Sequence, residues 1–162
     1  MTDRVGFGYD VHATAEGRPL VLGGVRFDSK WGLEGYSDAD VIAHAIGDAL
    51  LGAAALGDLG VHFPPGEPKW KDVSSLVLLT EIARMLQVRG FRIGNVDATL
   101  LAERPSLGPR RDEMRRRLAE ALGISPDQVS VKATTNERLG FVGRQEGLAA
   151  MAVARIVRDQ TP

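Results

Sequence analysis

Apolar residues recur along the chain at two spacings, one typical of helices and one typical of strands. A helical spacing of three and four follows Asp40, where one wide apolar face would be formed by Val41, Ile42, Ala45, Ile46, Ala49 and Leu50. The same spacing predicts helices over segments 72–89 and 109–122. Runs of alternating or β-branched apolar residues instead predict strands over segments 5–12, 20–27, 91–102, 129–133 and 147–158.

Turn-forming and capping residues predict how these elements are joined. The sequence Gly17-Arg18-Pro19 separates the first two strands, which favours a hairpin between them. Ser37 stands three residues before Asp40 and resembles a capping box for the helix that follows. A proline at position 109 fits the first turn of the third helix. Glycines are expected to end the three helices, at Gly57 and Gly60, at Gly90, and at Gly123.

The last segment, 147–158, decides the fold class. Its alternating Leu148, Ala150, Ala152, Ala154 and Ile156 favour a strand, whereas its high alanine content would also suit a helix. A strand allows helices and strands to segregate. We therefore predict an α+β fold with a single-layer β-sheet and helices packed on one face.

Composition narrows the class of protein. The 162 residues predict one domain spanning 1–162. The net charge of −1 argues against a nucleic-acid-binding protein that works by bulk charge. The absence of cysteine removes disulfides, thiol nucleophiles and Cys-type zinc sites. No signal peptide and no apolar run long enough for a membrane span are apparent. We expect a cytoplasmic protein with neither nucleic acid nor a membrane as its partner.

The histidines of the chain, His12, His44 and His62, raise the question of a metal site. Asp10 and His12 are two residues apart on a predicted strand, so their side chains share one face. His44 lies on the first predicted helix, one turn before Asp48, whose carboxylate could orient the imidazole. One Asp and two His suit zinc and leave a position for substrate. A hydrogen-bonded core histidine is the alternative, and spacing alone leaves both open.

Segment 132–144 carries a second group of polar residues. It follows a predicted strand and holds two hydroxyls, one carboxylate, two glycines and two arginines. Hydroxyls and backbone amides at a strand end can hold phosphate oxygens, and a carboxylate can hold magnesium between phosphates. An ordinary polar turn explains the same residues equally well.

The ordered motifs are more specific than any single one. They comprise Gly8-Tyr9-Asp10-Val11-His12, segments 37–45 and 52–60, Gly94-Asn95-Val96-Asp97, Lys132-Ala133-Thr134-Thr135, Leu139-Gly140-Phe141 and Gly143-Arg144. Together they resemble the 2-C-methyl-D-erythritol 2,4-cyclodiphosphate synthase family of the non-mevalonate isoprenoid pathway. The length of the chain is similar to that of the stand-alone enzyme, so we expect that form rather than the one fused to a cytidylyltransferase.

This resemblance implies a fold, an assembly and a reaction. The implied fold is a ferredoxin-like arrangement assembled as a homotrimer, with active sites between subunits. In the implied reaction the 2-phosphate of a cytidine-diphosphate-linked methylerythritol attacks the β-phosphate, which closes a cyclic diphosphate and expels CMP. Intramolecular phosphoryl transfer of this kind depends mainly on positioning and on charge neutralisation.

The resemblance also implies roles for individual residues. Zinc would be held by Asp10, His12 and His44. Glu137 would hold a second ion, magnesium or manganese, and Thr135 would stabilise the transition state. The methylerythritol phosphate would contact Ser37, Asp58, Gly60 and Phe63. The cytosine end would contact Ala102, Pro105, Leu107 and Thr134. An isoprenoid diphosphate in a cavity on the trimer axis would lie near Phe141 and Arg144.

Three positions depart from the family pattern. Tyr36 stands where many relatives carry a histidine that is credited with a catalytic role; a tyrosine can donate a hydrogen bond but is neutral at pH 7. Pro65 replaces an aspartate and Ser106 replaces a lysine. The competing interpretations are a zinc-dependent hydrolase of a nucleotide diphosphate and a catalytically silent module that binds metal or isoprenoid diphosphate.

Overall fold

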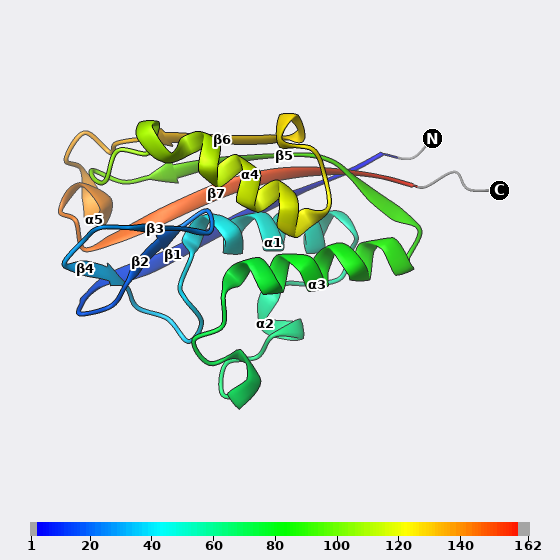
Figure 1. The fold of residues 1–162 in the computed structure, drawn as a ribbon, viewed down its shortest axis with the longest axis horizontal. Helices are drawn as coiled ribbons and strands as arrows, with labels where there is room; N and C mark the ends of the chain where they lie inside the picture. Colours follow the sequence, from blue (N-terminus) through cyan, green and yellow to red (C-terminus); the bar gives the residue numbers. More distant parts are fainter. Residues whose placement is uncertain (1–2, 159–162) are drawn as a thin grey trace.

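The computed structural model describes residues 3–158, which form a five-stranded sheet with helices against one face (Figure 1). In spatial order the strands are β4 (Trp31–Leu33), β1 (Arg4–Glu16), β7 (Gly147–Arg158), β5 (Phe91–Leu101) and β6 (Val129–Thr134). β5 and β6 run parallel to each other, and the other neighbouring pairs are antiparallel. The sheet is therefore mixed.

Three longer helices lie on the covered side of this sheet: α1 (Val41–Ala53), α3 (Ser75–Val88) and α4 (Arg111–Leu122). Short helical turns complete the chain, namely α2 (Leu59–His62), α5 (Gly140–Gly143), η1 (Pro68–Trp70), η2 (Gly108–Arg110) and η3 (Pro126–Gln128). The predicted α+β class is confirmed, whereas the ferredoxin-like arrangement stays a prediction. Among the described residues, no helix has the length and apolar character needed to cross a membrane.

The strand prediction for segment 147–158 is confirmed, and burial follows its alternation. On β7 the side chains of Ala150, Ala152 and Ala154 are buried beneath the helices, while Met151 and Val153 on the opposite face are 39% and 44% exposed. The paired strand β1 continues this outer apolar face. Its exposed members are Val5, Phe7, Tyr9 and Val11.

The inner face of β1 contains glycine where the strand meets α1. A Cβ atom on Gly6 would lie 1.9 Å from the carbonyl oxygen of Ala49, and one on Gly8 would lie 2.0 Å from that of Ala45. Main chain therefore packs directly against main chain, with alanines on the helix side. This close approach brings the part of β1 that carries Asp10 and His12 against the helix that carries His44.

The predicted strand 20–27 and its hairpin with the first strand are both wrong. The segment forms its own two-stranded hairpin, β2 (Leu20–Leu22) and β3 (Val25–Phe27), because Gly23 and Gly24 adopt positive φ values of 57° and 74°. This backbone conformation makes a tight reversal that glycine permits without strain. β1 pairs instead with β7 and, near its end, with β4.

Helix boundaries differ from the predictions in two places. Asp40, not Ser37, caps α1, because its carboxylate accepts the N–H groups of Ile42 and Ala43. α1 ends at Ala53, ahead of the predicted glycines, and Ala55 follows with a positive φ of 58°. The 3₁₀ turn η2 contains the proline at 109 and leads into α4. The predicted terminations at Gly90 and Gly123 are confirmed by their positive φ values.

Candidate metal centre and its cleft

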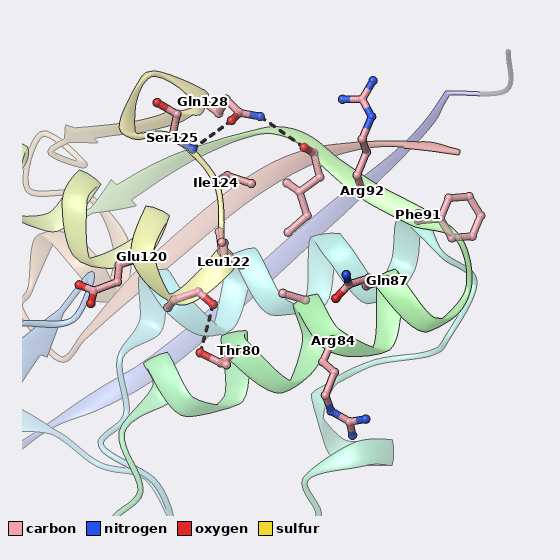
Figure 2. A pocket seen from close by; sticks show the side chains of 14 residues that line it. Thr80, Arg84, Gln87, Phe91, Arg92, Glu120, Leu122, Ile124, Ser125 and Gln128 are labelled. Carbon is pink, nitrogen blue, oxygen red and sulfur yellow. Dashed lines mark hydrogen bonds between the residues drawn. The ribbon is translucent and has the colours of Figure 1, made fainter. Parts of the chain in front are cut away.

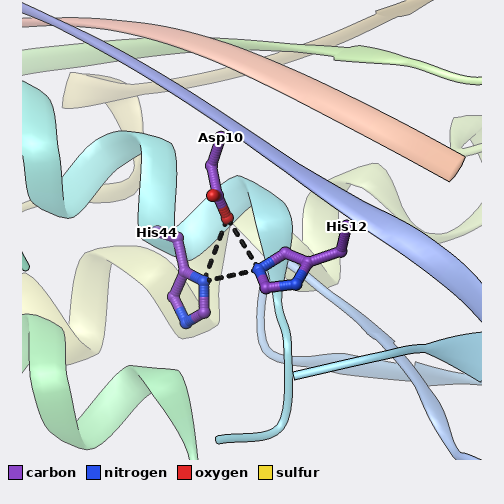
Figure 3. A group of neighbouring side chains, drawn as sticks. All are labelled: Asp10, His12 and His44. Carbon is purple, nitrogen blue, oxygen red and sulfur yellow. Dashed lines mark hydrogen bonds and ion pairs between the residues drawn. The ribbon is translucent and has the colours of Figure 1, made fainter. Parts of the chain in front are cut away.

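Asp10, His12 and His44 converge at one point between β1 and α1 (Figure 3). Oδ2 of Asp10 lies 2.9 Å from Nε2 of His12 and 3.0 Å from Nδ1 of His44, and the two ring nitrogens are 3.1 Å apart. Within residues 3–158 this is the one group of three such side chains close enough to share a metal ion. The strand and the helix thus bring together residues 34 positions apart in the sequence.

Main-chain and side-chain contacts hold the His12 ring in this orientation. Its Nδ1 lies 2.6 Å from the carbonyl oxygen of Glu34, which can only accept a hydrogen bond. Nδ1 therefore carries the proton of the neutral ring, and Nε2 then turns its lone pair toward Asp10. In the protonated ring Nε2 carries the second proton and donates it to Asp10. Burial alone would lower the pKa of His12, but the hydrogen bond to Asp10 and its negative charge outweigh burial and raise it. Burial opposes ionisation of Asp10, yet hydrogen bonds from the two imidazoles in their protonated form, together with their positive charge, lower its pKa to about 2.

The donor set fits a zinc ion. Two imidazole nitrogens and one ionised carboxylate oxygen are the ligands that zinc takes in catalytic sites, where a fourth position stays available. Lone pairs that converge at about 3 Å repel one another unless a cation or a proton lies between them. The pKa of His12 is raised for the same reason, because a positive charge next to the Asp10 carboxylate is stabilised.

The second nitrogen of the His44 ring contacts two hydroxyl groups. Its Nε2 lies 2.9 Å from Oγ of Ser75 and 3.1 Å from Oγ of Ser37. The hypothesis that Asp48 orients this imidazole is wrong, because the Asp48 carboxylate accepts the N–H of Leu59 at 2.8 Å instead. Sequence reasoning missed Ser75, which is 31 residues from His44 and gives no local signal.

A cleft of about 440 Å³ opens beside Asp10, His12 and His44, the group of candidate ligands that is called the metal-ligand cluster below. Its walls include residues expected to contact the methylerythritol phosphate, namely Ser37, Asp58, Gly60 and Phe63, and also Tyr36, Pro65 and Trp70. Asp58 caps the short helix α2 by accepting the N–H of Val61 at 3.1 Å. Trp70 packs edge-on against Phe63 at a centroid distance of 5.0 Å, and the sequence analysis did not single it out. The third histidine, His62, bonds the Leu56 carbonyl and is not in the cluster.

The residues expected at the nucleotide end of the substrate and at the second metal ion lie at the end of β6 or on the loops after β5 and β6, and they do not line this cleft. Ala102 and Leu107 are buried, and Ala102 donates its N–H to the carbonyl of Thr134 at 3.0 Å. Thr135 donates its hydroxyl to Glu137 at 3.2 Å. Pro105 follows the cis Arg104–Pro105 peptide bond. One chain therefore presents two separate groups of expected site residues.

Glu103, which the sequence analysis did not select, stabilises the loop after β6 that carries Thr135 and Glu137. Its carboxylate accepts the N–H groups of Asn136 and Arg138, at 3.0 and 3.2 Å. Glu137 and Arg138 both have positive φ values, 50° and 63°, so these bonds stabilise a turn that side-chain-bearing residues rarely adopt. The turn leaves Glu137 and Thr135 exposed at the end of β6.

The expected residues near the trimer axis lie in and just after α5. Phe141 is 36% exposed, and Arg144 forms a two-point ion pair with Glu146 at 2.9 and 3.1 Å. Both face solvent in the single chain.

Comparison with known proteins places the chain in a family. The model of the YgbB family matches residues 3–157. The chain belongs to the YgbB family. The match covers the metal-ligand cluster, the cleft and the loops after β5 and β6.

Curated relatives in the YgbB family are of two lengths. The chain is 65% identical over 154 residues to the bifunctional enzyme IspD/IspF of Anaeromyxobacter sp. (strain Fw109-5), covering 95% of this chain and 40% of that protein. The chain thus spans about two fifths of the length of the bifunctional relatives. It is also 54% identical over 156 residues to the 2-C-methyl-D-erythritol 2,4-cyclodiphosphate synthase of Synechococcus elongatus, covering 96% of this chain and 98% of that one.

Solved structures agree with this YgbB assignment. The IspF of Plasmodium falciparum, solved as a CDP complex, superposes with a TM-score of 0.85 at 30% identity, covering 98% of this chain and 97% of that chain. The fold and the order of elements are therefore shared along almost the full length of both chains.

A larger cleft of about 740 Å³ lies between α3, α4 and β5 (Figure 2). Several of its polar groups are bonded to other groups of the protein within or beside the cleft. Thr80 donates to the carbonyl of Ala121, Gln128 bonds both the Ser125 N–H and the Gly94 carbonyl, and Arg84 pairs with Glu81. These contacts are structural, and the metal-ligand cluster lies elsewhere. In this YgbB chain the smaller cleft is the candidate active site.

Proposed function

We propose that the chain is a cyclodiphosphate synthase, a phosphorus–oxygen lyase that converts 4-diphosphocytidyl-2-C-methyl-D-erythritol 2-phosphate to 2-C-methyl-D-erythritol 2,4-cyclodiphosphate and CMP. The observation that carries the proposal is the convergence of Asp10, His12 and His44 beside a cleft in a chain of this family. Relatives named for this synthase are 54% to 59% identical over nearly the whole chain.

The reaction needs an ionised nucleophile held in line with the bond that breaks. An oxygen of the 2-phosphate forms a bond to the β-phosphorus, the bond from that phosphorus to the bridging oxygen breaks, and the bridging oxygen leaves with CMP. No proton has to be removed from the attacking phosphate. Zinc bound by Asp10, His12 and His44 would neutralise charge on the β-phosphate. The protein's own contribution is to align the two phosphates.

The cleft residues hold the methylerythritol phosphate in this proposal. Ser37 and Asp58 offer a hydroxyl and a carboxylate to the sugar hydroxyls, Gly60 offers main chain, and Phe63 closes the apolar side. Tyr36 lines the same cleft, and its neutral hydroxyl donates a hydrogen bond to a phosphate oxygen.

In this proposal the nucleotide end of the substrate binds residues of a neighbouring subunit. Ala102, Pro105, Leu107 and Thr134 would contact cytosine. Thr135 would bond the diphosphate, and Glu137 would hold magnesium or manganese between the α- and β-phosphates. This division is supported by the observation that these loops and the cleft are separate within one chain. Residues 1–162 would form one synthase domain, and the active site would be complete only between subunits.

The assembly we propose is a homotrimer. Its support is the outer face of β1 and β7, where Val5 and Phe7 are 68% and 61% exposed and Met151 and Val153 continue the apolar surface. Contiguous apolar surface of this kind marks a protein interface. Phe141 and Arg144 would lie near the trimer axis, and there Arg144 can bind the diphosphate of an isoprenoid.

Phosphorus NMR of the protein with substrate, zinc and magnesium tests the reaction. We expect a cyclic diphosphate together with CMP. Linear phosphate products would contradict the proposal in favour of a hydrolase, and absence of turnover in a zinc-loaded trimer would contradict it in favour of a binding module.

A further inference from the structure

The two nitrogens of the His44 ring have different surroundings. Nδ1 faces Asp10 and His12, whereas Nε2 faces the hydroxyl of Ser75 at 2.9 Å. Ser75 is the first residue of α3 and is 1% exposed, so water does not compete for this contact. The longer contact of Nε2 with Ser37, at 3.1 Å, involves a hydroxyl that also accepts the N–H of Ala39.

A carboxylate lies behind the Ser75 hydroxyl. Asp38 accepts the hydroxyl of Ser75, and it also accepts the backbone N–H groups of Ser75 at 2.9 Å and of Asp40 at 3.1 Å. The N–H of Asp38 in turn donates to the carbonyl of Val73 at 3.0 Å. The loop before α1 is thereby fastened to the start of α3, and the Asp38 carboxylate is fixed by three donors.

These contacts determine which nitrogen of His44 carries a proton. An ionised carboxylate only accepts hydrogen bonds, so the bond between Asp38 and Ser75 uses the hydroxyl hydrogen of Ser75. Ser75 then has only lone pairs to offer to His44. At this contact, which is shorter than the one with Ser37, Nε2 of His44 is therefore the donor, and the lone pair of the neutral ring is left on Nδ1, where it points at Asp10 and His12.

We propose that Ser75 and Asp38 are positioning residues that fix His44 in the tautomer and orientation required of a metal ligand. The inference rests on the proposed zinc centre. Partners of this type raise the basicity of a ligating imidazole and hold its ring in place. Among the hydrogen bonds of the described residues, none joins Asp38 or Ser75 to Asp10 or His12, so the effect of both residues on the candidate metal site passes through His44.

The test is zinc affinity of the full chain, measured by competition with a chromophoric chelator, together with the absorption spectrum of the cobalt-substituted protein. Ser75→Ala removes the acceptor for Nε2 and is expected to weaken zinc binding about 10- to 100-fold and to change the cobalt spectrum. Asp38→Asn preserves the size of the side chain but lets an amide N–H face Ser75. It no longer dictates the tautomer and is expected to weaken zinc binding in the same direction.

Ser74→Ala is the matched control. The Ser74 hydroxyl caps the same helix by accepting the N–H of Leu76, and it makes no hydrogen bond to His44 among the described residues. This variant should lose helix stability while zinc affinity and the cobalt spectrum stay unchanged. Zinc affinity of Ser75→Ala within about twofold of the unsubstituted protein would overturn the inference while leaving the proposed function intact. Failure of the unsubstituted protein to bind zinc would overturn both.

Discussion

Gly8 of β1 lies directly against the main chain of Ala45 in α1, the residue that follows His44. A Cβ atom at position 8 would stand 2.0 Å from the Ala45 carbonyl oxygen and 2.8 Å from the N–H nitrogen of Ala49. Only a residue without a side chain allows strand and helix to approach this closely. The distance of Asp10 and His12 on β1 from His44 on α1 therefore depends on a glycine that is not one of the candidate metal ligands.

Replacing Gly8 with alanine should separate these two elements. The added methyl group meets main chain, which cannot rotate away, so α1 must shift. We expect a loss of about 3 kcal/mol or more in the free energy of unfolding, at the upper end of overpacking effects, and weaker zinc binding. Urea unfolding and chelator competition measure the two effects.

Gly52→Ala in the same helix is the control for the Gly8 variant. Gly52 is exposed, and the nearest atom to its added Cβ would be 4.0 Å away. This substitution should stabilise the protein by up to about 1 kcal/mol through helix propensity. If both substitutions changed the free energy of unfolding and the zinc affinity equally, close packing of Gly8 against α1 would not be the cause.

His44→Ala should abolish turnover and zinc binding while the trimer persists. His44 supplies one of the three converging ligand atoms, and two ligands rarely retain zinc. Metal analysis of the purified protein and sedimentation measure the outcome. His62→Ala serves as control, since His62 bonds the Leu56 carbonyl outside the cluster and its variant should retain full zinc content. Full activity of zinc-free protein would refute the assignment.

Glu137→Gln should lower the rate and raise the magnesium concentration needed for half-maximal activity, while zinc content stays intact. The carboxylate is exposed beside Thr135, away from the zinc ligands, and an amide binds magnesium far more weakly. Titration of activity with magnesium measures this. Glu81→Gln, on the surface of α3, is the control. An unchanged magnesium dependence would argue against a metal-binding role of Glu137.

The stability of the metal-free protein should fall as pH rises through the range in which Asp40 ionises. Burial, with the nearby charge of Asp38, raises the pKa of Asp40 to about 6, although backbone N–H donors partly oppose this. The folded state then binds a proton that the unfolded chain releases near pH 4. We expect a loss of about 3 kcal/mol in the free energy of unfolding between about pH 4 and pH 7.

Comparing the protein with Asp40→Asn isolates this effect. The raised pKa of His12 gives a slope of the same sign in both proteins, and Asp10, with a pKa of about 2, stays ionised throughout. Urea unfolding at about pH 5 and about pH 7.5 should show a smaller pH dependence for the variant. Identical slopes would mean that Asp40 does not titrate in this range.

Phe7→Asp should dissociate the proposed trimer and abolish activity while zinc binding by the single chain survives. Phe7 is 61% exposed on the outer sheet face, and a buried charge there would lack a partner. Light scattering measures the mass of the assembly. Val88→Asp, at a site that is 74% exposed at the end of α3, should leave the assembly intact. A Phe7 variant that remains trimeric would exclude this face as the interface.

The local sequence was sufficient to predict most helices and strands, but it did not predict which of them pair or pack together. The alternation of apolar residues predicted β7, and Gly90 and Gly123 predicted the ends of α3 and α4, where the structure shows them with positive φ. Strand alternation and helix termination could be predicted because both depend on residues only a few positions apart. The single strand predicted for segment 20–27 failed for a different reason, since the Gly23-Gly24 pair is itself a local turn signal that the prediction did not use. Two adjacent glycines reverse the chain inside it, and the apolar pattern on either side gives no sign of the break.

The sequence by itself determined the fold class and the family resemblance, because residue type, periodicity and ordered motifs carry that information. Asp10, His12 and His44 became candidate metal ligands through that resemblance, since their spacing alone left a core histidine open. Tertiary structure alone decided which side chains complete the site. Ser75 reaches His44 across 31 residues and Glu103 reaches Asn136 across 33, because α3 packs beside α1 and the loops after the parallel strands β5 and β6 meet. Contacts of this kind depend on how elements pack, and no local pattern encodes them.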